Sequence, residues 1–170
     1  MRLFGAFFVV IASAFVGFGF AAAVRRQCRQ QEALLSALEL MKNEMLYRMT
    51  PLSDVFAQLR SGGESAVAEL FERWSENLYG TAYMSVELAL QRAIEQTHEL
   101  NLPPESLQTL RTLAQSLGKL DVDGQCSAIR LAQTQLESQL ALTRAGSEKR
   151  AQSYRTVGVC AGLAVAVILL

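Results

Sequence analysis

The chain has 170 residues, enough for one domain with short additional segments. Its 16 basic residues balance 16 acidic ones, so the overall charge does not indicate nucleic acid or an acidic substrate as a partner. The charges are unevenly placed, because Arg2 is the only charged residue before Arg25 and none follows Arg155. The sequence therefore predicts a polar middle region between two apolar ends.

The first apolar segment covers residues 3–24 and contains no charged residue. About 20 helical residues cross the hydrocarbon core of a bilayer, so this segment is long enough to span a membrane. A cleaved signal peptide is the alternative, because Ala21, Ala22 and Ala23 offer a small-residue cleavage site. The length of the apolar stretch and the single basic residue before it, Arg2, favour a retained transmembrane helix over residues 1–24.

The last apolar segment, residues 157–170, is also uncharged but shorter. As a helix it is about 21 Å long, less than the roughly 30 Å hydrocarbon core, so it crosses only a locally thinned bilayer. We predict a short C-terminal transmembrane helix over residues 156–170, with a re-entrant segment as the alternative. Arg155 is expected to extend its charged end to the membrane surface.

Small residues four positions apart occur in both apolar ends. This spacing lets helices approach closely in lipid, although it also arises by chance in anchors rich in glycine and alanine. We predict that the two ends pack on each other or on neighbouring membrane proteins, with small residues that have no partner as the alternative. The candidate packing residues are Ser13, Gly17, Ala21, Gly158 and Gly162.

Basic residues flank the inner side of each apolar end, whereas only Arg2 lies on the outer side. Loops on the cytoplasmic side of a membrane are enriched in lysine and arginine. The middle region, residues 25–155, is therefore predicted to be cytoplasmic, with both termini outside. The residues that carry this prediction are Arg25, Arg26, Arg29, Lys149, Arg150 and Arg155.

Apolar residues of the middle region recur at spacings of three and four, and no stretch alternates in the manner of a strand. A first helix is expected to run unbroken from the membrane to about Met49. Thr50 and Pro51 suit the start of a short second helix. Asp121 suits the N-cap of a long last helix that continues into the second apolar end. The predicted fold is all-α, a small bundle of about six helices.

Residues that could support chemistry are few. His98 is the only histidine, and the three cysteines, Cys28, Cys126 and Cys160, lack metal-ligand spacing. Gly62 and Gly63 lack the lysine of a phosphate-binding loop. Asp121 and Asp123 fit turn and cap roles better than a calcium site. The sequence therefore predicts no catalytic, metal or cofactor site.

Other residues form short motifs in a fixed order. Residues 44–52 read E-x-x-Y-x-x-T-P-L, residues 117–121 read L-G-K-L-D, and Y-R-T-V-G-V follows at residues 154–159. Together with the two apolar ends, this pattern resembles the stage III sporulation protein AB family. The pattern departs from the family at Leu120, where a serine is expected before Asp121. The T-P-L-x-x-x-F element also resembles the repeat of the inner-membrane platform proteins of type II secretion and type IV pilus systems.

The resemblance implies a bundle of the platform type and a role without catalysis. Family members are expected in the mother-cell membrane around the forespore, as scaffold subunits of a secretion-like channel complex required for sporulation. A cytoplasmic ATPase and other channel subunits are the expected partners, with no nucleic acid, and a homo-oligomer is possible. A membrane-tethered sensor or tether protein is the alternative function, and a membrane-bound enzyme that uses carboxylates is a further one. The candidate partner-contact or motif residues are Glu44, Tyr47, Thr50, Pro51 and Leu52.

Overall fold

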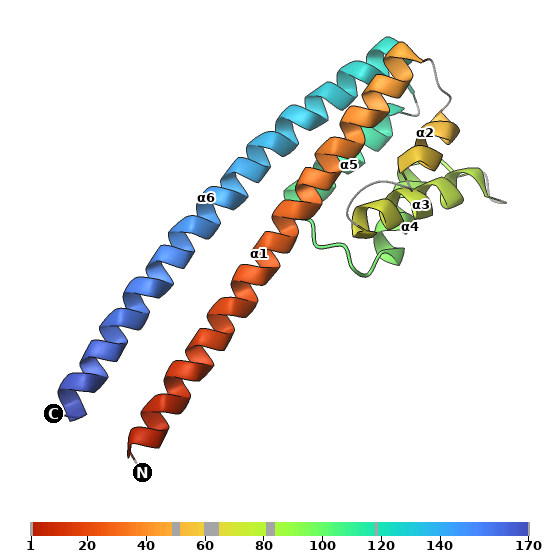
Figure 1. The fold of residues 1–170 in the computed structure, drawn as a ribbon. Coiled ribbons are helices and arrows are strands. Elements are labelled where there is room, and N and C mark those ends of the chain that lie inside the picture. The colour runs from red at the N-terminus through yellow and green to blue at the C-terminus, as the bar shows by residue number, and fades with distance from the viewer. Residues whose placement is uncertain (1, 49–51, 60–64, 81–83, 118, 170) are drawn as a thin grey trace. The chain divides into compact units, whose positions relative to one another are not determined.

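The computed structural model describes the backbone of residues 2–48, 52–59, 65–80, 84–117 and 119–169, and the side chains of residues 22–48, 54–56, 58–59, 66–80, 84–117 and 119–146. Over these residues all regular structure is helical, which confirms the predicted all-α class (Figure 1). The helices in chain order are α1 (Arg2–Tyr47), α2 (Leu52–Leu59), α3 (Ser65–Tyr79), α4 (Val86–Gln96), α5 (Pro104–Leu117) and α6 (Val122–Leu169).

The chain divides into two compact units. One contains residues 1–26 and 141–170, which are the N-terminal part of α1 and the C-terminal part of α6. The other contains residues 27–140, with the rest of both helices and all of α2 to α5; we call it the core unit. The long first and last helices of the prediction are therefore present, since α1 has 46 residues and α6 has 48.

Within the part of the chain that the structure describes, no helix combines the length and the apolarity that a membrane crossing requires. The two predicted transmembrane segments fall almost entirely on positions whose side chains lie outside the described residues. The same holds for the candidate helix-packing positions Ser13, Gly17, Ala21, Gly158 and Gly162. Membrane attachment remains a prediction at this point.

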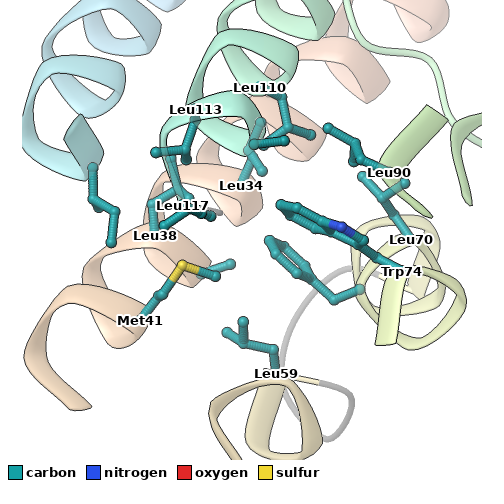
Figure 2. Close-up of a cluster of buried hydrophobic side chains, with 14 of the residues drawn as sticks. Leu34, Leu38, Met41, Leu59, Leu70, Trp74, Leu90, Leu110, Leu113 and Leu117 are labelled. Carbon is teal, nitrogen blue, oxygen red and sulfur yellow. The ribbon is translucent and has the colours of Figure 1, made fainter. Parts of the chain in front are cut away.

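Three aromatic side chains form the centre of the core unit. Phe56 of α2 lies 5.0 Å from Trp74 of α3 and 6.0 Å from Phe71 between ring centroids, and all three are fully buried. Trp74 also donates from Nε1 to the carbonyl of Val86 at 3.0 Å, which ties α3 to the start of α4. Leucines of several helices surround this cluster, among them Leu34 of α1 (Figure 2).

Local signals at the helix ends agree with the predicted boundaries. Asp121 caps α6, because its carboxylate accepts from the amide of Gly124 at 3.0 Å and its carbonyl from the amide of Gln125 at 2.8 Å. The amide of Gly80 bonds the carbonyl of Glu76, and an added Cβ at Gly80 would lie 2.5 Å from that oxygen, so the end of α3 requires a glycine. The departure at Leu120 does not prevent the aspartate cap.

Candidate partner-contact site

The predicted motif begins at the C-terminal end of α1, where Glu44 is the only buried carboxylate among the described residues, with 5% of its surface exposed. Its Oε1 lies 3.0 Å from a guanidinium nitrogen of Arg48, one helical turn on. Its Oε2 accepts a hydrogen bond from Gln58 of α2 at 3.3 Å. Glu44 therefore acts within the chain, because it fixes α2 and the last turn of α1 to each other.

Tyr47 lies three residues further along and faces solvent, with 78% of its surface exposed. Its neighbour Leu46 is 38% exposed, and the Arg48 side chain is 72% exposed. A large aromatic side chain that is left outside the core, beside an arginine whose position is set by Glu44, is typical of protein contact sites. Of the motif residues with described side chains, Tyr47 is the one available to a partner.

The remaining motif residues follow directly after this helix end. Thr50 and Pro51 lie outside the described residues, and so does the side chain of Leu52, which begins α2. Their predicted role as a helix start therefore stays a prediction. We define Leu46, Tyr47 and Arg48, the last described residues before α2, as the motif corner.

The structure also shows a chain of buried hydrogen bonds that was not predicted from the sequence; we call it the polar seam. Gln31 of α1 donates to the hydroxyl of Ser106 on α5 at 2.9 Å, and that hydroxyl donates to Gln139 of α6 at 2.9 Å. Gln139 in turn donates to the hydroxyl of Thr109 at 3.0 Å. The polar seam thus connects α1, α5 and α6 through side chains that are mostly removed from water.

Gln30 makes a second polar attachment of α1. Its amide donates to the carbonyl of Glu99 at 3.0 Å, and its oxygen accepts from the amide of Asn101 at 2.6 Å. These two bonds fix the segment between α4 and α5, where the backbone has no helical partners of its own. The spacing from Gln31 to Leu34 and Leu38 continues the buried stripe of α1, and this periodicity is a signal that Gln31 is buried.

The model of the family described as stage III sporulation protein AB matches residues 2–170. The chain belongs to this family. The stage III sporulation protein AB of Bacillus subtilis (strain 168) is 28% identical over 171 residues, which cover 100% of this chain and 99% of that protein.

The chain is also similar to a solved structure of a stage III sporulation protein AB, with a TM-score of 0.65 and 26% sequence identity. The match covers 72% of this chain and 97% of the solved one. Family and fold are therefore as the short motifs predicted. Membership assigns the chain a role in sporulation.

Few of the side chains that the structure describes in this stage III sporulation protein AB family member are arranged for bond-making chemistry. Among the described residues, no group of three or more histidine, cysteine or carboxylate side chains could hold a metal ion. His98 is exposed in the turn after α4. Burial, with a smaller contribution from Asp123, raises the pKa of the Cys126 thiol, which disfavours the reactive thiolate.

Proposed function

We propose that the chain is a structural subunit of a secretion-like channel complex in the mother-cell membrane around the forespore, and that it docks a cytoplasmic ATPase. The observation that carries the proposal is the motif corner, where Tyr47 is 78% exposed on a helix end held by Glu44. A tyrosine side chain has two rotatable bonds and loses little conformational freedom on binding, so it favours a specific contact.

Membrane attachment is the second part of the proposal, and the sequence supports it. Both ends of the chain are uncharged over long stretches, and the basic residues beside them favour a cytoplasmic core unit with both termini outside. α1 and α6, which carry these ends, are also the helices that the polar seam joins through Ser106. Such a bundle suits a scaffold that resembles the platform proteins, because a force on the core unit acts directly on both helices.

A structural role agrees better with the described side chains than the enzyme alternative does. A carboxylate enzyme needs two or more acidic groups in one cleft, with pKa values moved apart. Glu44 is the one buried carboxylate of the described residues, and its oxygens already bind Arg48 and Gln58. Its bonds are those of a residue that positions the helix end.

The docking proposal predicts that Tyr47→Ala separates partner binding from folding. Removing an aromatic contact residue commonly costs 2 kcal/mol or more of binding free energy, which is a loss of about 30-fold or more in affinity. The variant should keep its helical content, since an exposed side chain contributes little to the core. The measurement is recovery of the ATPase and other channel subunits when the tagged full-length chain is purified from sporulating cells.

Tyr79→Ala is the matched control, because Tyr79 is another exposed tyrosine of the core unit, with 52% exposure at the end of α3. It should recover the same partners as the unmodified chain. Partner recovery that is equal for both variants would contradict the docking site. An unmodified chain that brings down neither the ATPase nor any channel subunit would contradict the scaffold role and favour the tether alternative.

A further inference from the structure

The neutral charge of the whole chain conceals a separation of charge along it. The two segments that border the apolar ends, residues 25–29 and 144–155, contain seven basic residues and one acidic residue. Residues 30–143 contain 15 acidic and eight basic residues. We call the first set the basic borders. The basic borders are thus strongly positive, whereas the rest of the middle region is negative.

Basic residues of the chain differ in whether a carboxylate pairs with them. In the core unit, Lys42 pairs with Glu39 at 2.6 Å and Arg48 with Glu44 at 3.0 Å. At the first basic border, Arg25 and Arg29 are exposed and make no ion pair with the side chains that the structure describes. Their charges are therefore available to an external anion.

The spacing of these two arginines favours an anion between them. Arg25 and Arg29 lie four residues apart in α1, so their side chains emerge one turn apart on the same helix face. Like charges at this spacing repel each other, and a bound anion relieves the repulsion. Guanidinium groups bind phosphate through paired N–H donors, so a phosphate ester suits this position.

We propose that Arg25 and Arg29 of the first basic border bind the headgroup of an anionic phospholipid. The inference rests on the proposed membrane attachment, because Arg25 directly follows the first apolar segment and would lie at headgroup level. The negative charge of residues 30–143 has the opposite effect, since an anionic membrane surface repels it.

The test uses the full-length chain in neutral detergent micelles and two fluorescent probes, phosphatidylglycerol and phosphatidylcholine. Each arginine near an anionic surface contributes about fivefold in affinity, so Arg25→Gln with Arg29→Gln should weaken phosphatidylglycerol binding about tenfold or more. Unmodified chain should prefer phosphatidylglycerol about tenfold or more at low salt. The preference should largely disappear near 1 M salt, where the Debye length is about 3 Å.

The matched control is Arg92→Gln with Arg111→Gln, which removes the same charge from two exposed positions of the core unit. This double variant should change the affinity for phosphatidylglycerol less than about twofold, because isolated surface charges contribute little. Equal affinity for the two lipids, or an equal loss in both double variants, would overturn the inference. Tighter binding of a single-stranded oligonucleotide than of phosphatidylglycerol at the same salt would also overturn it.

Carbonate washing of cell membranes separates this inference from the function on which it rests. A chain that resists the wash but shows no headgroup preference refutes headgroup binding alone. A chain that the wash extracts refutes membrane attachment, and headgroup binding with it.

Discussion

Trp74→Ala is expected to lower the free energy of unfolding by about 3–5 kcal/mol, the usual cost of deleting a large aromatic side chain from a core. Trp74 is fully buried, and its ring lies 5.0 Å from Phe56 and 5.8 Å from Phe71 between centroids. The substitution removes contacts with two helices at once. It also leaves the carbonyl of Val86 without its side-chain donor.

The measurement is denaturant unfolding of the full-length chain in detergent, followed by circular dichroism. Fluorescence is unsuitable because Trp74 is the only tryptophan. Tyr79→Ala, an aromatic deletion on the same helix at a half-exposed position, should cost clearly less, about 1 kcal/mol. Equal losses for the two variants would show that the aromatic cluster does not form the core of the unit.

Ser106→Ala is expected to cost about 2–4 kcal/mol, which is large for the removal of one oxygen atom. The Ser106 hydroxyl accepts a hydrogen bond from the Gln31 amide and donates one to the Gln139 oxygen. Its loss therefore leaves the buried Gln31 donor and the partly buried Gln139 acceptor without this partner. Each unmet polar group of this kind costs about 1–3 kcal/mol. The same unfolding measurement applies.

Ser116→Ala is the control, because Ser116 lies on the same helix and its hydroxyl bonds the carbonyl of Thr112 in an exposed position. Its replacement should change stability by about 0.5 kcal/mol or less. A Ser106 variant as stable as the Ser116 variant would mean that the polar seam contributes nothing to holding α1, α5 and α6 together.

The sequence predicted the helices well because their signals are local. The stripe Leu34, Leu38, Met41 and Met45 gives the buried face of α1, and Asp121 gives the start of α6. Such patterns depend on residues within one or two turns of each other. The family resemblance likewise rested on short motifs in order, and the comparisons confirmed it.

The arrangement in space was not predicted, because it depends on residues far apart in the chain. Gln31 and Ser106 are 75 positions apart, and no local pattern indicates that a glutamine will meet a serine. The sequence also did not show which of the two motif residues, Glu44 or Tyr47, is buried and which is exposed. Glu44 lies at the edge of the buried stripe and Tyr47 just beyond it, so packing against α2 gives one an internal role and leaves the other exposed.

The proposed cytoplasmic placement of the core unit and its proposed attachment by membrane segments are tested most directly by thiol labelling of whole cells. Cys126 is a poor reporter because it is buried and its pKa is raised. Ser138 is exposed on α6, so Ser138→Cys in a chain whose three native cysteines are replaced supplies a single accessible thiol. The chain is produced in non-sporulating cells, so that the plasma membrane is the membrane into which it inserts. A membrane-impermeant maleimide should label membrane-bound chain only after the cells are permeabilised. Full labelling in intact cells would contradict the cytoplasmic placement, and recovery of the chain in the soluble fraction would contradict the proposed attachment.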